Sequence, residues 1–380
     1  MDVPMCTRCG RRPANYYRVS SGERLCLNCL FKSIEDTVLW TIRRYRLISD
    51  GDKVGIAISG GKDSLTLMYL LGKFRRQGKI PRDVELIAFS INEGHPYSCF
   101  YRMARVDYVQ KLSEEFNIPY RVYTFKELFG VTASDVAHGL WSRGGINVHM
   151  CTIDGVLRRR AMNIIGRQLG LTKIATGHNL DDEAQTVLLN VLSNDLDRFA
   201  WFGPRPEVDR EGFIPRIKPL RFVREEEIAI YAYYHGIPLM ELECPPFVYS
   251  NPRYELKFTL ARWERDNPNI KYSLVSFGDS LANLMGEKAV NVPLKRCRYC
   301  GEPTSSDVCR VCELMNRAGL LEKYLNHLRT LKLIDTQSPP RSSYPRPQHY
   351  SLGSVIGIPC STQSLIPPLR AYHSIRNRTL

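Results

Sequence analysis

The sequence lacks the features that direct a chain into or across a membrane. Its first six residues, Met1 to Cys6, hold no basic region followed by an apolar stretch, so we expect no secretory signal. The longest uncharged run, residues 349–369, contains three prolines and many serines, which argues against a membrane span. We therefore expect a cytoplasmic protein with no membrane partner.

Acidic residues are too few to balance the basic ones. The 380 residues include 53 Lys and Arg against 39 Asp and Glu, a formal net charge of +14, and phosphate-rich RNA binds such basic surfaces. Residues 333–380 are rich in Pro and Ser and carry no acid from Gln337 onward, which predicts a disordered basic tail that contacts RNA. Elsewhere the basic residues gather in four groups: Arg43, Arg44 and Arg46; Lys73, Arg75, Arg76 and Lys79; Arg216, Lys218, Arg221 and Arg224; and Lys295, Arg296 and Arg298.

Twelve cysteines are present, and a reducing compartment disfavours structural disulfides. Eight of them form two pairs of CxxC units, and each pair can supply four thiolates to one tetrahedral zinc ion, so we predict two closed, structural zinc sites. The alternatives are buried thiols or pairing between the two sets, and Cys99 and Cys360 have no partner pattern. The predicted ligands are Cys6, Cys9, Cys26 and Cys29 for one zinc, and Cys297, Cys300, Cys309 and Cys312 for the other.

Between the two cysteine sets, β-rich runs alternate with helical patterns. Hydrophobic residues at 43% and charged residues at 24% are ordinary for a folded protein. Predicted strands cover residues 53–59, 84–91, 120–125 and 173–176, and predicted helices lie near 63–76, 101–116, 156–169 and 181–192. This alternation predicts an α/β fold, a parallel sheet with helices on both faces. In such sheets ligands bind beyond the carboxyl ends of the strands.

The first predicted strand ends in the hexapeptide SGGKDS at residues 59–64. Two glycines let the backbone fold around an anion, the first amides of the next helix point at it, and Lys62 adds a cation. A Walker A loop is excluded because Asp63 follows the lysine where Ser or Thr is required. The hexapeptide instead resembles the PP-loop of the N-type ATP pyrophosphatases, which bind ATP and adenylate a substrate. The alternative is an ordinary glycine-rich turn whose helix is merely capped by Asp63 or Ser64.

The fourth predicted strand leads into GHNLDDE at residues 177–183. Asp181 and Asp182 could hold Mg²⁺ against nucleotide phosphates at the mouth of the same sheet. Helix N-capping is the alternative for these acids, and His178 could equally be a core histidine. The combination of this block with SGGKDS in one sheet favours the nucleotide site.

Together these blocks resemble the TtcA/TtuA family of tRNA 2-thiolation enzymes, in the branch that makes 2-thiouridine. The resemblance runs from about Cys6 to Cys312 and includes both cysteine sets, SGGKDS, ATGHNLDDEAQT at 175–186, CTIDGVLRRR at 151–160 and Cys244-Pro245. It implies that ATP adenylates the C2 oxygen of a tRNA uridine, a sulfur nucleophile attacks C2, and AMP leaves. It also implies a homodimer and a ubiquitin-like sulfur carrier as partners, with ATP, Mg²⁺ and two Zn²⁺ as cofactors.

The family's site positions carry over onto this chain residue by residue. Asp182 matches an aspartate that positions metal or nucleotide, and Arg158 stands where some members have a phosphate-facing lysine. Arginine keeps the charge there, while a solvated basic helix face is the alternative for Arg158. The implied ATP site consists of Ala57, Ser59, Gly60, Gly61, Lys62, Asp63, Ser64, Ser90, Arg158 and Gly177.

One position departs from the family pattern. Members of this branch carry three cleft cysteines, two of them as CxxC, which can hold a 4Fe-4S cluster; here Asp154 replaces the middle one, while Cys151 and Cys244 remain. Aspartate is a harder donor than thiolate, which puts a cluster on Cys151, Asp154 and Cys244 in doubt. Without a cluster, the two cysteines could act as a persulfide and resolving pair, provided that Arg158 lowers a thiol pKa. Burial as small hydrophobes is the alternative. The predicted catalytic residues are Cys151, Cys244 and Asp182.

The predicted organisation has six parts: an N-terminal zinc ribbon (1–31), a linker helix (32–50), a PP-loop catalytic domain (51–245), a helical segment (246–290), a C-terminal zinc ribbon and helix (291–332) and the basic tail (333–380). Two other functions stay open. One is a zinc-ribbon RNA-binding protein with a vestigial nucleotide site, against which the intact SGGKDS and Asp181-Asp182 argue. The other is an adenylating PP-loop enzyme with an amine nucleophile, which predicts no role for Cys151 and Cys244.

Overall fold

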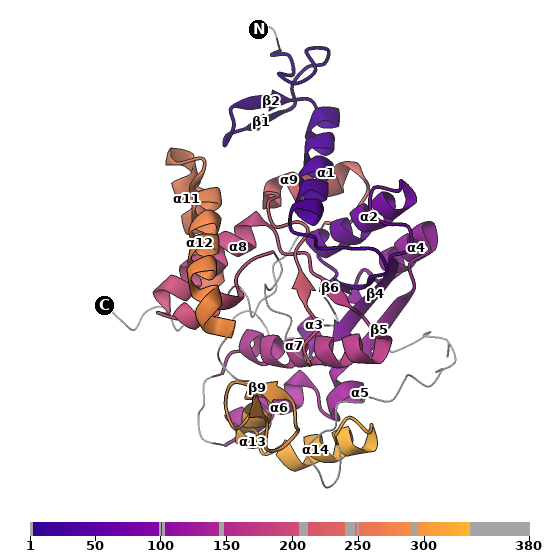
Figure 1. Ribbon diagram of the computed structural model, residues 1–380, viewed down its shortest axis with the longest axis vertical. Helices are drawn as coiled ribbons and strands as arrows, with labels where there is room; N and C mark the ends of the chain where they lie inside the picture. Colours follow the sequence, from indigo (N-terminus) through magenta and orange to yellow (C-terminus); the bar gives the residue numbers. More distant parts are fainter. Residues whose placement is uncertain are drawn as a thin grey trace, which may run out of the picture. The chain divides into compact units, whose positions relative to one another are not determined.

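A computed structural model describes residues 3–98, 100, 103–143, 148–204, 212–239, 248, 251–290 and 295–334 (Figure 1). These residues belong to one compact unit, Met1–Pro347. Within them, every helix is too short or too polar to cross a bilayer. The predicted tail from residue 335 onward lies outside the described ranges, as do Cys99, Cys244 and Cys360.

A five-stranded parallel sheet, in the order β5-β4-β3-β6-β7, forms the centre of the unit. The four predicted strands are confirmed, and a fifth, β7, was not predicted. Because β3 pairs with β4 on one side and with β6 on the other, the strand order reverses beside the end of β3, where ligands bind in such folds. The strands are β3 (Lys53–Ile58), β4 (Glu85–Asn92), β5 (Tyr120–Thr124), β6 (Lys173–Ala175) and β7 (Arg216–Ile217).

Helices cover both faces of this sheet (Figure 1). Successive strand residues point to opposite faces, so Leu86 and Ala88 of β4 join one core while Phe89 and Ile91 join the other. The first core also takes side chains from α1 (Leu27–Arg44), α2 (Lys62–Arg76), α4 (Val106–Phe116) and α9 (Glu225–Tyr234). The second takes them from α5 (Phe125–Phe129), α6 (Ala133–Trp141) and α7 (Met150–Leu169), and the short α3 (Pro96–Ser98) follows β4.

A separate group of helices packs beside the sheet. Leu180 and Ala184 of α8 form a small core with Leu260 of α11 and Val275 of α12. The 3-10 helix η2 contributes Phe199 to a second small core next to it. These elements are α8 (Leu180–Leu192), η2 (Leu196–Trp201), α11 (Pro252–Asp266) and α12 (Ile270–Val290).

Each cysteine set stands beside a two-stranded hairpin. The N-terminal hairpin is β1 (Tyr16–Arg18) with β2 (Glu23–Leu25), and the C-terminal one is β8 (Lys295–Arg296) with β9 (Pro303–Thr304), followed by α13 (Arg310–Arg317) and α14 (Leu321–Thr330). The C-terminal set shares its hydrophobic core with α7. Glu302, between the two strands of that hairpin, forms ion pairs with Arg160 and Arg167 of α7, the latter at 3.2 Å. The ribbon and α7 are therefore one packed structure.

Candidate functional site

The PP-loop joins β3 to α2 at the point where the strand order reverses. Gly60 has a φ of +81°, a left-handed conformation that favours glycine, and Gly61 is extended at the N-cap of α2. No side chain caps this helix, so its first amides are available to an anion, and the capping alternative for Asp63 and Ser64 is wrong. Ser64 braces the loop instead, since its Oγ accepts from Ser59 N at 3.1 Å and donates to Gly61 O at 2.9 Å.

Lys62 is held at the loop by two carboxylates. Its Nζ lies 2.8 Å from Glu225 Oε1 and 3.2 Å from Asp63 Oδ2. Burial acts to lower the pKa of Lys62, but the charges of Asp63 and Glu225 outweigh it and raise that pKa, so the lysine stays protonated. Glu225 also pairs with Lys257 at 3.3 Å. The sequence did not single out Glu225, because acids are common in the first turn of any helix.

Three carboxylates, those of Asp63, Asp182 and Glu225, influence one another beside the loop. Burial raises the pKa of Asp63; Lys62 opposes this, while Asp182 and Glu225 raise the pKa further. Burial likewise raises the pKa of Asp182 to about 6, although Arg253 acts in the opposite direction. Carboxylate oxygens gathered at one point are the ligands that Mg²⁺ prefers, and here they lie beside the lysine of the PP-loop.

The turn between β6 and α8 contains the rest of the second block. Asn179 and Asp182 form a capping box, in which each side chain accepts a hydrogen bond from the other's main-chain N–H, so the capping interpretation of Asp182 is confirmed. Asp181 pairs with Lys271 at 2.5 Å and is an ion-pair partner. Asn179 Nδ2 also donates to Asp63 Oδ1 at 3.1 Å, which ties this turn to the PP-loop.

Gly177 brings the same turn against the PP-loop backbone. A Cβ at this position would lie 2.8 Å from Ser64 N and 2.9 Å from the carbonyl carbon of Asp63, far inside normal contact distance. Glycine is therefore required for the two loops to approach. Its neighbour His178 is exposed and shares a 2.9 Å hydrogen bond with Thr176, so the interpretation of His178 as a core histidine is wrong.

Ala57 and Ser90 lie near the same edge of the sheet, on neighbouring strands. Ile58 pairs with Ser90 in register, and Ala57 pairs with Phe89. Ser90 is fully buried and its Oγ accepts a hydrogen bond from Tyr120 Oη at 2.8 Å. Ser90 is also paired with Ile58 and with Val122 in the sheet, and its contact with a nucleotide stays a prediction.

The N-terminal half of α7 carries Cys151, Asp154 and Arg158. Asp154 is buried and its Oδ2 lies 3.2 Å from His95 Nε2, while Arg158 pairs with the buried Glu93 at 2.9 Å. Burial and the charge of Asp154 raise the pKa of the Cys151 thiol, and Arg158 offsets them only in part, so the expected lowering of this pKa is not found. His95 and Glu93 gave no sequence signal, because only the turn after β4 brings them to α7.

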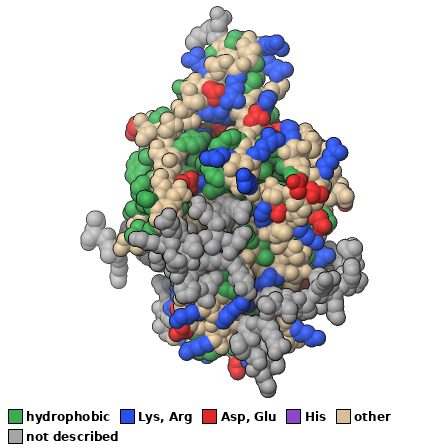
Figure 2. Space-filling view, viewed as in Figure 1, with side chains coloured by type: hydrophobic (Ala, Val, Ile, Leu, Met, Phe, Trp, Pro, Cys, Tyr) green, Lys and Arg blue, Asp and Glu red, His purple; other side chains and the backbone are tan. Residues whose placement is uncertain are grey.

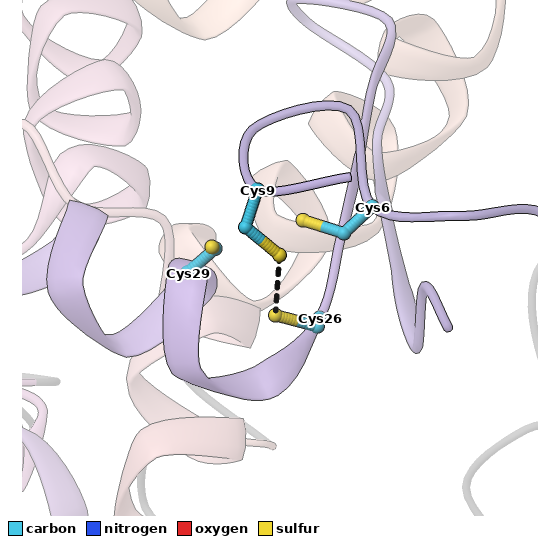
Figure 3. A group of neighbouring side chains, drawn as sticks. All are labelled: Cys6, Cys9, Cys26 and Cys29. Carbon is cyan, nitrogen blue, oxygen red and sulfur yellow. Dashed lines mark hydrogen bonds between the residues drawn. The ribbon is translucent and has the colours of Figure 1, made fainter. Parts of the chain in front are cut away.

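The four cysteines of the N-terminal set converge (Figure 3). Cys6 and Cys9 come from one loop, Cys26 caps α1 and Cys29 lies in its first turn. The four sulfur atoms lie within 4.8 Å of one another, and those of Cys9 and Cys26 are 3.9 Å apart. Zinc–sulfur bonds of about 2.3 Å in a tetrahedron place the sulfurs about 3.8 Å apart, so this spacing fits a metal ion and not a disulfide. Main-chain hydrogen bonds, that from Cys26 first, lower the pKa of Cys6 to about 6, which favours the thiolate.

The C-terminal set has the same geometry in a more enclosed setting. Its sulfur atoms also lie within 4.8 Å of one another, and those of Cys300 and Cys309 are 3.7 Å apart. All four residues are buried, and Cys309 N donates to Cys297 Sγ at 3.2 Å. Each CxxC set thus closes on itself, and the predicted pairing alternative between the sets is wrong.

Lys and Arg side chains are spread over the face shown in Figure 2. Two of the four members of one predicted basic group do not belong to this surface, however. Arg221 is fully buried and pairs with Glu183 and Asp279, and Arg224 is 2% exposed and pairs with Glu264 at 3.1 Å. These two arginines are internal ion-pair partners and cannot contact RNA.

Comparison with known proteins places these features in a family. A family model described as the PP-loop domain matches residues 38–243. The chain is 32% identical over 317 residues to cytoplasmic tRNA 2-thiolation protein 1 of Oryza sativa subsp. japonica, which covers 82% of each chain. It is 34% identical over 327 residues to tRNA 2-thiolation protein NcsA of Haloferax volcanii, covering 82% of this chain and 98% of that one. Among solved structures, the U34-tRNA thiolase NcsA from Methanococcus maripaludis with its 4Fe-4S cluster matches with a TM-score of 0.68 and 30% identity, over 83% of this chain and 97% of that one.

Proposed function

Because this chain belongs to the PP-loop family of tRNA 2-thiolation proteins, we propose that it is an ATP-dependent tRNA sulfurtransferase that makes 2-thiouridine. The observation that carries the proposal is the PP-loop itself, with open helix amides, a protonated Lys62 and the Gly177 turn packed against it. Nothing in this geometry suggests a vestigial nucleotide site. The names of the relatives also support a cytoplasmic location.

The nucleotide-binding residues have distinct tasks in this proposal. The amides of α2 and Lys62 hold the ATP phosphates, and Asp63 and Asp182 hold Mg²⁺ against them. When the phosphates bind Lys62, they displace Glu225 from that lysine. Glu225 then keeps its ion pair with Lys257. The uridine C2 oxygen attacks the α-phosphorus and pyrophosphate leaves. A sulfur nucleophile adds to C2, and AMP departs with the former C2 oxygen.

Several groups outside the nucleotide site complete the proposal. The two closed cysteine sets bind structural zinc, because four thiolates leave no open position on the metal. For a 4Fe-4S cluster, the described residues offer the Cys151 thiol and a buried Asp154 oxygen that lacks a hydrogen bond, a donor set that fits iron. With Cys244 these residues would hold the cluster, which would supply an iron that binds sulfur.

Two partners beyond tRNA are part of the proposal. A ubiquitin-like sulfur carrier delivers the sulfur atom, as the family resemblance implies. Exposed apolar side chains on α8 and α12 support a homodimer. Leu192 of α8 is 72% exposed and Leu284 of α12 is 74% exposed.

Mass spectrometry of tRNA from cells that lack this chain tests the activity. We expect a 2-thiouridine to disappear and to return on expression of the wild-type chain but not of Lys62→Ala. An unchanged content of 2-thiouridine would overturn the proposal. The variants Cys151→Ala and Cys244→Ala distinguish tRNA thiolation from an adenylating enzyme with an amine nucleophile. Full thiolation in both variants would show that neither cysteine takes part in sulfur transfer.

A further inference from the structure

Asp154 has one carboxylate oxygen that the fold leaves without a partner. The residue is 8% exposed, and its Oδ2 contacts His95 Nε2 at 3.2 Å. Its Oδ1 is buried and makes no hydrogen bond to any described residue. A buried carboxylate oxygen without a donor is costly, so such an atom calls for a ligand, either an ordered water or a cation.

A chain of hydrogen bonds determines which oxygen stays free. Ser98 N donates to His95 Nδ1 at 3.1 Å, so His95 carries its proton on Nε2 and donates it to Asp154 Oδ2. Ser98 Oγ in turn donates to Glu93, whose other oxygen binds Arg158. His95 thus fixes the carboxylate through one oxygen and leaves the other to a ligand, an arrangement common around metal sites.

A thiol lies on the same side of α7 as this oxygen. Cys151 precedes Asp154 by three residues, and residues at this spacing are neighbours on a helix. The thiol is half-buried. A soft donor and a hard donor therefore lie side by side on α7, and His95 fixes the hard one.

We propose that Asp154 binds iron through Oδ1, beside Cys151, so that one iron of the cluster in this chain is ligated by oxygen, with His95 as the positioning residue. This inference rests on the proposed function, because the cluster is known from the solved relative. Iron on a harder oxygen donor is held less firmly than iron on a third thiolate. We therefore expect the iron on Asp154 to leave more readily than the irons on thiolates, in addition to the open iron that binds sulfur.

The test measures iron in the full-length chain, purified without oxygen and reconstituted with ferrous iron and sulfide. Asp154→Cys should hold the same cluster on three thiolates, and ferricyanide should remove only its open iron, which gives a three-iron form seen by electron paramagnetic resonance. The wild-type cluster should also lose the iron on Asp154, so ferricyanide should give little of this three-iron signal. Asp154→Ala should retain little iron. His95→Ala should bind iron about 10-fold more weakly, and His95→Gln should restore it, because an amide can also donate to Oδ2. Asp36→Ala, which removes an exposed acid on α1, is the matched control and should behave as wild type.

Three results would overturn the inference. One is wild-type iron content and spectrum in Asp154→Ala. Another is a cluster in Asp154→Cys and none in the wild type, which would mean that Asp154 excludes it. The third is no iron in either protein. Zinc content and the melting temperature (Tm) of each variant show whether it is folded. Because 2-thiouridine is measured separately, continued thiolation alongside any of these results would reject the iron ligand and leave the function standing.

Discussion

Replacement of Gly177 by alanine tests whether contact between the two loops builds the nucleotide site. The added Cβ would lie 2.8, 2.9 and 3.0 Å from Ser64 N, Asp63 C and Ser64 Cα, all main-chain atoms at the start of α2. Ordinary contact begins at 3.4 Å, so one loop must move by about 0.6 Å. These are main-chain atoms, so no side chain can rotate away from the added Cβ. The substitution must therefore either destabilise the fold or displace the phosphate site.

The expected cost is that of an overpacked core, about 1–3 kcal/mol. If the loops stay together, the strain lowers the melting temperature by about 1–4 °C, because a unit of this size has a large entropy of unfolding. If they move apart, the first amides of α2 shift and ATP binds more weakly, by about tenfold for each 1.4 kcal/mol. Calorimetric titration with ATP and a thermal melt of the same sample measure both effects.

Gly155→Ala is the matched control. Gly155 lies inside α7, where the nearest atom to an added Cβ is 3.9 Å away at the end of the Arg159 side chain. Alanine there should leave stability unchanged or raise it by up to about 1 kcal/mol. If Gly177→Ala has both the wild-type Tm and the wild-type affinity for ATP, the contact has no role and the reasoning is refuted.

Three further predictions follow from the same structure. Glu302→Ala leaves the guanidinium groups of Arg160 and Arg167 without their buried carboxylate, and urea unfolding should show a loss of about 3–5 kcal/mol; a wild-type unfolding curve would contradict the ion-pair assignment. Because burial raises the pKa of Asp182 to about 6, its carboxylate is lost to protonation as the pH falls through that value, so the rate of pyrophosphate release should fall as the pH drops through about 6. Asp182→Asn should abolish that dependence, and an unchanged profile in this variant would exclude Asp182 as the titrating group. Elemental analysis should find two zinc ions per chain, one of which is lost in Cys300→Ser together with thermal stability, whereas an undiminished zinc content would remove Cys300 from the ligands.

Local patterns predicted those parts of the molecule that neighbouring residues determine. The four predicted strands and the PP-loop follow from periodicity and from glycine chemistry, and the cysteine sets follow from their spacing. The two-residue strand β7 was missed because Arg216–Ile217 is too short to show any periodicity.

The features that the sequence did not predict depend on partners that are distant in sequence. Arg221 reads as part of a basic run, yet Glu183 and Asp279 neutralise it from 38 and 58 positions away. His95 and Asp154 are likewise 59 positions apart, so no local pattern could show that they pair. Gly177 was assigned to the nucleotide site by resemblance, and only the structure shows that it acts through the PP-loop backbone.

The ion pairs between the C-terminal ribbon and α7 connect the proposed zinc site of the ribbon with the proposed iron site on α7. Glu302 lies two residues after Cys300 of the C-terminal cysteine set. It anchors α7 through Arg160 and Arg167, on the same helix that carries Cys151 and Asp154. If the metal that this ribbon holds is zinc, as we propose, the free energy of zinc binding also stabilises the positions of those two side chains. Our proposal then predicts that loss of zinc from the ribbon weakens sulfur transfer although Cys151 and Asp154 are unchanged.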